Sequence, residues 1–218
     1  MNAAPKPRRR TQAERSEAMR ARLAAAAFET AASGGIGALR MRSVAEAAGV
    51  SQGALLHHFP DKNALVLAAI EEALTLARND SSSGLQSEAA DARCVLLAML
   101  AEFRAFFFSD RFWVAIAITM EAAKDPDFNP AVRATVANLR KPVYAAWQDR
   151  LIEAGWDRAS AARTVRSGAS LVSGAAIRRF WAEQDDIAAQ VEADWLEDRL
   201  RALEPSRAEP PMNVPVSD

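Results

Sequence analysis

The chain has 218 residues, of which half are hydrophobic and a quarter are charged, and its formal net charge is −1. This composition predicts a folded protein with a packed core and excludes a largely disordered chain. The longest apolar runs, residues 95–101 and 112–118, are too short to span a bilayer, so we expect no signal peptide, no transmembrane helix and no membrane partner.

The small net charge hides an uneven distribution along the chain. Residues 1–62 carry ten Lys or Arg against five Asp or Glu, a net of +5, whereas residues 63–218 carry seventeen against twenty-three, a net of −6. A basic first quarter on an acidic body is typical of a module that binds a polyanion. Chance clustering of charge beside a solvated basic arm is the alternative.

Helix-forming residues dominate the sequence, and no alternating run predicts a strand. We expect an all-α protein with about nine helices, covering residues 14–32, 41–48, 51–59, 62–78, 88–108, 111–124, 130–154, 158–183 and 187–203. The predicted domains are a disordered basic arm (1–13), a three-helix helix-turn-helix domain with the helix that follows it (14–78), a larger helical bundle (79–204) and a disordered tail (205–218). A loop rich in Ser, Asn and Asp at residues 79–84 marks the main boundary.

Residues 41–60, with the sequence MRSVAEAAGVSQGALLHHFP, have the pattern of two short helices joined by a tight turn. Val44 and Ala45 are expected to face the core, and Gly49 supplies the positive φ that the turn requires. Ser51 is a good N-cap for the second helix, and Leu55 packs that helix against the first. The pattern predicts a helix-turn-helix whose second helix is free to enter the major groove of DNA.

The exposed face of the second helix offers side chains that suit DNA. Gln52 can read adenine or donate to a phosphate, His57 can donate to a guanine edge, and Gly53 permits close approach. Ser51 lies where backbone N–H groups favour phosphate, and Lys62 suits a phosphate contact. The predicted DNA-binding residues are Arg40, Arg42, Ser51, Gln52, Gly53, Ala54, His57, His58 and Lys62. Adjacent histidines point about 100° apart on a helix, so we expect His58 to be partly packed and the pair to hold no metal.

The stretch 23–69 resembles the DNA-binding domain of the tetracycline-repressor (TetR) family, with AAF at 26–28 and VAEAAGVSQGALLHHFPDKNAL at 44–65. The resemblance implies a homodimer through the last two long helices and a C-terminal domain that binds a small-molecule effector and thereby releases the DNA operator. The sequence departs from the family pattern where Arg40 replaces a frequent capping hydroxyl. Ala54 and Leu56 stand where threonine and tyrosine are frequent, so a phosphate-binding hydroxyl is missing.

The second half of the chain contains many aromatic residues, which could line a cavity for an apolar or aromatic molecule. The predicted pocket residues are Phe103, Phe107, Trp113, Met120, Glu121, Tyr144, Trp147, Ser170 and Ser173. Aromatic residues at helical spacing are usually plain core, which is the alternative. Glu121 is the candidate polar group of the cavity, with a surface position as its alternative. The lone Cys94 fits a reducing cytoplasm and is expected to be a small buried side chain, with a redox-sensing thiol as the alternative.

The sequence contains no G-x-S-x-G, phosphate-loop or H-E-x-x-H motif, and its two histidines both lie in the predicted DNA reader. We therefore expect no enzyme activity and no cofactor. The leading hypothesis is a cytoplasmic, sequence-specific transcription regulator, a repressor that binds a palindromic double-stranded DNA operator and is released by a small apolar or aromatic ligand. The alternative is a helical small-molecule-binding protein whose helix-turn-helix no longer reads DNA. An activator or a nucleoid-type protein is a third hypothesis.

Overall fold

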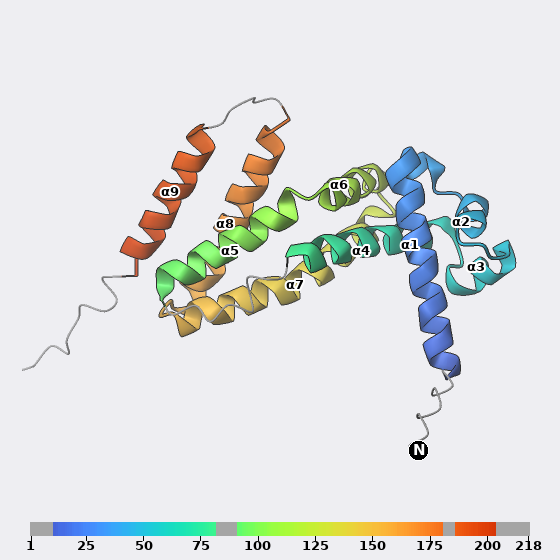
Figure 1. Cartoon of the computed structure of the whole chain (residues 1–218), viewed down its shortest axis with the longest axis horizontal. Coiled ribbons are helices and arrows are strands. Elements are labelled where there is room, and N and C mark those ends of the chain that lie inside the picture. Colours follow the sequence, from blue (N-terminus) through green and yellow to red (C-terminus); the bar gives the residue numbers. More distant parts are fainter. Residues whose placement is uncertain (1–10, 82–90, 181–185, 204–218) are drawn as a thin grey trace, which may run out of the picture. The chain divides into compact units, whose positions relative to one another are not determined.

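The computed structural model describes residues 11–81, 91–180 and 186–203 (Figure 1). Within these residues every regular element is a helix, and the nine helices confirm the predicted all-α fold. The chain divides into two compact units, the first made of residues 1–76 and 113–137 and the second of residues 77–112 and 138–218. The predicted tail lies outside the described residues, and so does the predicted arm except for residues 11–13, which cap and begin the first helix.

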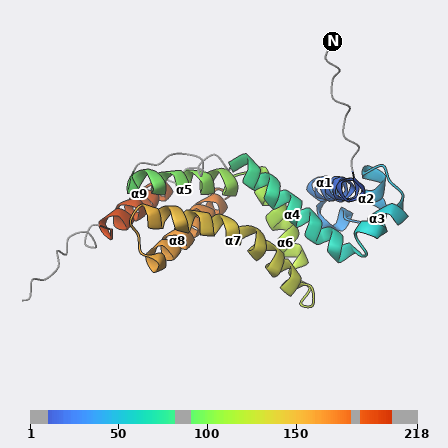
Figure 2. The ribbon, with the colours of Figure 1, turned by 90° about the horizontal axis from the view of Figure 1, so that it is seen from below.

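The first unit contains four consecutive N-terminal helices and two later segments. They are α1 (Gln12–Ala38), α2 (Met41–Ala47), α3 (Gln52–His58), most of α4 (Lys62–Ser81), most of α6 (Asp110–Ala122) and the start of α7 (Asn129–Glu153). Asp61 Oδ1 accepts the Ala64 N–H at 2.8 Å and so caps α4, as the sequence predicts. Figures 1 and 2 show α2 and α3 beside the middle of α1.

Helix α1 is longer than predicted at both ends. Thr11 Oγ1 accepts the Glu14 N–H at 3.2 Å, and Glu14 Oε2 accepts the Thr11 N–H at 2.7 Å. This capping box begins the helix two residues before the predicted start. At the other end Gly35 leaves helical geometry with φ of 68° and ψ of −178°, and a further turn then runs to Ala38. The predicted break is therefore real, but it is an interruption and not the end of the segment.

The core of the first unit is built from segments far apart in sequence. Leu23, Val44, Leu55 and Leu65 are fully buried, one from each of α1 to α4. The same core includes residues of α6, of the turn after it and of the start of α7, namely Ile118, Ala122, Phe128 and Val132. The contact-defined unit therefore extends beyond the predicted domain of residues 14–78, because the N-terminal helices alone leave part of their apolar surface for this later segment to cover.

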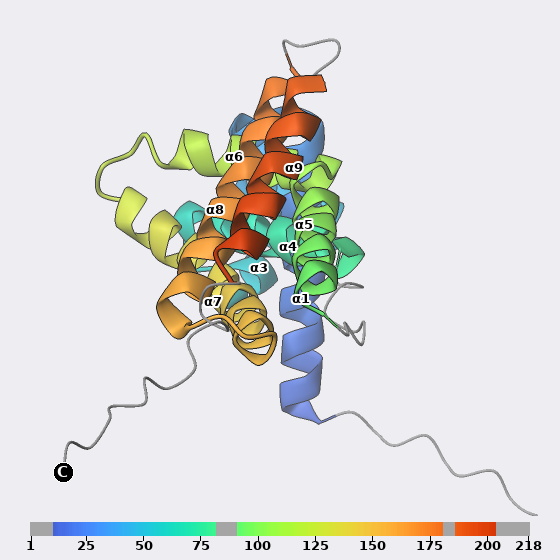
Figure 3. The same ribbon diagram turned by 90° about the vertical axis from the view of Figure 1, so that its left-hand side faces the viewer.

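The second unit is a bundle of α5 (Ala92–Phe107), the later part of α7, α8 (Arg158–Arg178) and α9 (Asp186–Arg201). Helix α5 packs against α8 and α9, which also pack against each other, and the three lie side by side in Figures 1 and 3. Their shared core includes Leu96, Met99, Trp147, Val165 and Leu196. None of the described helices is long and apolar enough to cross a membrane.

Helix α5 has a clear start, and it places the side chain of Cys94 on its exposed face. Asp91 Oδ1 accepts the Cys94 N–H at 2.8 Å and caps the helix, which starts at Ala92; residues 88–90 of the predicted helix lie outside the described residues. The prediction that Cys94 is buried is wrong: it is exposed, because the inward stripe of α5 runs through Val95, Leu96 and Met99. A hydrogen bond with Asp91 raises the pKa of the Cys94 thiol, which disfavours the thiolate and hence the redox-sensor alternative.

Candidate nucleic-acid interface

The turn between α2 and α3 has the geometry that the sequence predicts. Gly49 adopts φ of +64°, the left-handed region that a tight helix–helix turn needs. The N–H of Val50 donates to the carbonyl of Ala45 at 2.9 Å and closes the turn. Ser51 Oγ accepts the Ala54 N–H at 3.1 Å, which caps α3. Together with the buried Leu55, these contacts form a helix-turn-helix.

Helix α3 presents an exposed face made of short or uncharged side chains. Gln52, Gly53, Ala54 and His57 are exposed, and the apolar Leu56 is 43 % exposed. The predicted DNA-reading side chains thus point to solvent, while the buried Leu55 on the opposite side fixes the helix to its own unit. Their contacts with DNA stay a prediction.

The two histidines lie at the end of α3 in different environments. Their rings are 5.3 Å apart and nearly perpendicular. His57 is exposed and His58 is half-buried, which agrees with the expectation that only the second is partly packed. Within the described residues no group of three or more His, Cys, Asp or Glu side chains is placed to hold a metal ion.

Three further cations surround the helix-turn-helix. Arg40 precedes α2 and makes no side-chain cap, as expected for an arginine at that position. Arg42 Nε donates to Glu46 Oε1 at 2.8 Å, and this hydrogen bond raises the pKa of Arg42. Both partners of that pair are largely exposed, so the pair is weak. Lys62 is exposed at the start of α4.

Sequence reasoning missed two arginines of α1 that hold this motif. Arg20 Nη1 donates to the carbonyl of His58 at 3.1 Å, and its guanidinium lies 4.6 Å from the centre of the Phe59 ring. Arg22 Nη2 donates to the carbonyl of Ala48. These contacts span 38 and 26 residues, so no local spacing pattern could have indicated them.

The structure divides the predicted effector-pocket residues between the two units. Phe103, Phe107, Tyr144, Trp147, Ser170 and Ser173 belong to the second unit, whereas Trp113, Met120 and Glu121 belong to the first. Met120 is 66 % exposed, and Glu121 is exposed and ion-paired with Lys124. The expectation that Glu121 is the polar group of a cavity is not supported, because the inward face of α6 runs through Ala115, Ile118 and Ala122. On α8, Ser170 is exposed and Ser173 is half-buried.

Aromatic side chains of the second unit form a continuous cluster. The ring of Phe107 lies 5.0 Å from that of Phe112 and 6.3 Å from that of Phe103, which in turn lies 6.1 Å from Tyr144. Burial raises the pKa of the Tyr144 hydroxyl. Trp147 is fully buried, and its Nε1 has no hydrogen-bond partner among the described residues. The cluster is therefore mainly apolar, with an indole N–H that an added acceptor could satisfy.

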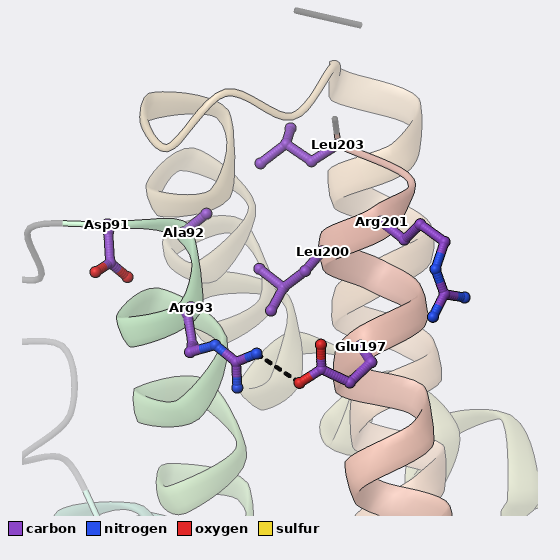
Figure 4. A pocket seen from close by; sticks show the side chains of 7 residues that line it. All are labelled: Asp91, Ala92, Arg93, Glu197, Leu200, Arg201 and Leu203. Atoms are coloured by element: carbon purple, nitrogen blue, oxygen red, sulfur yellow. Dashed lines mark hydrogen bonds and ion pairs between the residues drawn. The ribbon is translucent and has the colours of Figure 1, made fainter. Parts of the chain in front are cut away.

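A pocket of about 400 Å³ lies elsewhere in the second unit, between the start of α5 and the end of α9 (Figure 4). Arg93 and Glu197 form an ion pair across it, and both side chains are about half exposed. Its lining residues are Asp91, Ala92, Arg93, Glu197, Leu200, Arg201 and Leu203. None of them is a predicted effector-pocket residue, so the pocket and the aromatic cluster are different places.

Comparison with known proteins identifies a family and a relative that resemble this chain. Residues 23–69 match the model of the family described as bacterial regulatory proteins, tetR family. The HTH-type transcriptional regulator CymR of Pseudomonas putida is 33 % identical over 178 residues, which cover 80 % of this chain and 86 % of CymR.

Solved structures share the fold at lower identity. A transcriptional regulator of Streptomyces coelicolor A3(2) aligns with a TM-score of 0.62 and 21 % identity, covering 85 % of this chain and 98 % of its own. A regulator of Saccharomonospora viridis, solved in complex with choline, aligns with a TM-score of 0.59 and 21 % identity, covering 84 % and 96 % of the two chains. The similarity therefore extends over both units and not only over the helix-turn-helix.

Proposed function

Since this chain belongs to the tetR family of bacterial regulatory proteins, it is a DNA-binding transcription regulator, and we propose that it is a dimeric repressor released from a palindromic operator by a small apolar or aromatic molecule. The observation that carries the proposal is the outward face of α3, held on a folded helix-turn-helix. The repressor would act where chromosomal DNA is, in the cytoplasm. Residues 14–78 would serve as the DNA-binding module and residues 79–204 as the effector-binding and dimerisation module.

The proposed DNA contacts divide into two kinds. Gln52 and His57 are proposed to read base edges in the major groove, with Gly53 and Ala54 allowing close approach. Arg40, Arg42, Ser51 and Lys62 are proposed to contact phosphates, and His58 to support the end of the helix. Phosphate contacts by several cations predict an affinity that falls steeply with salt concentration.

A selection from random DNA followed by titration tests this assignment. The protein should enrich a palindromic sequence, and Gln52→Ala should weaken binding to it by about 1–3 kcal/mol, because one base contact is lost. Gln148→Ala is the matched control, since Gln148 is a partly exposed glutamine on α7 of the second unit. Unchanged operator affinity in the Gln52 variant would refute the placement of the reader. If no DNA sequence is enriched, the alternative of a small-molecule-binding protein that no longer reads DNA is favoured. The missing hydroxyls at Ala54 and Leu56 also favour that alternative.

Exposed apolar side chains at the end of α8 and the start of α9 support the proposed dimer. Phe180 is 61 % and Ile187 is 69 % exposed, and Ile177 and Val191 are also exposed. Large exposed apolar side chains that lie close together mark many protein–protein interfaces. Ile187→Asp should shift the protein from dimer to monomer in sedimentation experiments, because a charge would enter the apolar contact, whereas Ala145→Asp at an exposed position of α7 should not. A dimer that persists in the Ile187 variant places the interface elsewhere.

The aromatic cluster of α5 and α7 supports an apolar or aromatic effector. Its rings provide mutually tilted apolar faces, and Trp147 Nε1 offers a hydrogen bond to an acceptor on the ligand. A relative of the same fold was solved with choline, so the fold accommodates small organic molecules. A thermal-shift screen of aromatic compounds, followed by release of the selected operator, tests the proposal. A compound that stabilises the protein should also release the DNA.

A further inference from the structure

Arg20 and Arg22 lie on either flank of the buried stripe of α1. Residues on a helix are 100° apart, so Arg20 and Arg22 diverge to the two sides of Leu23, which is fully buried. One arginine reaches the end of α3 and the other reaches the end of α2. A single turn of α1 therefore contacts both helices of the motif.

The atoms that these arginines contact are backbone carbonyls at helix C-termini. The last four carbonyls of a helix have no partner within it, and the helix dipole makes that end negative. In helices of seven residues, such as α2 and α3, these carbonyls are a large share of the backbone. A guanidinium is suited to this position because it is always charged and donates in a fixed plane.

Each guanidinium has a second close neighbour besides the carbonyl that it binds. Arg20 also lies over the ring of Phe59, which is fully buried and follows α3 directly. At the other contact, a Cβ added to Gly49 would lie 3.1 Å from Arg22 Nη2. Gly49 therefore serves the turn twice, through its positive φ and by leaving room for Arg22 to pass.

We propose that Arg20 and Arg22 are positioning residues of the DNA reader, which fix the orientation of α3 by binding the carbonyl oxygens of His58 and Ala48. Arg20 would act through the end of α3, and Arg22 through the end of α2 and the turn that leads to α3; neither would act by contacting DNA. This inference rests on the DNA-binding function proposed above. The rival interpretation is that either arginine binds a DNA phosphate directly.

Arg20→Met and Arg22→Met test the inference, with Arg15→Met as the matched control. Methionine keeps an unbranched apolar stem and removes the charge and the donors. Arg15 lies on the same helix, and among the described residues its side chain bonds to Thr11 and Gln12 at the start of that helix. The measurements are affinity for the selected operator and for a random duplex as a function of salt, and hydrogen exchange of the α3 amides.

The two interpretations predict different patterns. If Arg20 and Arg22 are positioning residues, replacing either by Met should lower operator affinity about tenfold more than Arg15→Met does. That is the effect of about one lost base contact. Affinity for the random duplex should fall no more than in the Arg15 variant, and the α3 amides should exchange faster. Equal losses on both duplexes with a salt slope lower by about 0.9 would instead indicate a phosphate contact and overturn the proposal.

Unchanged exchange of the α3 amides would also overturn it. If a methionine variant melts below the assay temperature, the Arg→Lys variants replace it, because lysine retains the charge without the planar donor. These should show intermediate exchange at α3, and wild-type exchange in both would count against a role for guanidinium geometry. Failure of the wild type to enrich any DNA would refute the proposed function, while the exchange experiment still decides whether the arginines anchor α3.

Discussion

The two units stabilise their helices by different means. In the first unit α2 and α3 have seven residues each, too few to form helices alone, and they depend on two buried side chains in α2, one in α3 and polar contacts from α1. In the second unit α5 and α8 have 16 and 21 residues and share a long apolar stripe. The geometry of the helix-turn-helix therefore depends on a few specific contacts, whereas the stability of the second unit depends on the close packing of its apolar core.

The largest expected effect tests the dependence of α3 on a single anchor. Leu55→Ala should reduce the free energy of unfolding by about 2–5 kcal/mol, because it removes a fully buried side chain from a short helix. Leu56→Ala, one position along and exposed, should change it by about 0.5 kcal/mol or less. Chemical denaturation measures both, and similar losses at the two positions would break the proposed asymmetry of α3.

Two glycines on α8 test how closely the helices of the second unit are packed. A Cβ at Gly168 would lie 3.1 Å from Met99 Cε and 3.2 Å from Trp195 Cη2, so Gly168→Ala should destabilise the protein by about 1 kcal/mol or more through overpacking. At Gly174 nothing lies within 4 Å, so Gly174→Ala should stabilise the protein by about 0.5–1 kcal/mol. Thermal melts of the two variants should move in opposite directions; a gain at both positions would show that the bundle is loosely packed.

The smallest expected effect concerns the cap of α8. Hydrogen bonds from Ser160, and then from Ala159, lower the pKa of Asp157, whose Oδ1 accepts both N–H groups at 3.0 and 2.9 Å. A lowered pKa in the folded state means that the stabilisation is present above the ordinary Asp pKa and is lost as pH falls through the folded value. Asp157→Ala should therefore lower the melting temperature near neutral pH, and the difference from wild type should shrink below about pH 4. Asp149→Ala, on an exposed part of α7, is the control for replacing a surface aspartate and should leave the melting temperature near neutral pH close to that of the wild type.

Much of the first unit follows from local rules in the sequence. The positive φ of Gly49, the Ser51 cap and the burial of Leu55 were predictable because each is decided by residues within a few positions. The contacts of Arg20 and Arg22 were not, because they join residues 38 and 26 positions apart. The extension of this unit by α6 and α7 was not predictable for the same reason.

The second unit was predictable as a set of helices but not as a site. The helical spacing of aromatic residues is the same whether they line a cavity or fill a core, so it could not separate Phe103 from Met120. It also could not place Cys94, since one residue along α5 turns a side chain by 100° from the apolar stripe to the surface. The effector-pocket residues remain a proposal for this reason.

Helices α6 and α7 contribute to the core of the first unit. This matters for any fusion protein that would carry the helix-turn-helix domain without the rest of the chain. A fragment that stops at residue 78 lacks Ile118, Ala122, Phe128 and Val132, and it would expose the apolar surface that these side chains cover. A portable version must therefore supply a second peptide, or redesigned polar residues, in place of the missing segment. Because α4 and α7 each run unbroken from one unit into the other, any cut between the units also severs a helix.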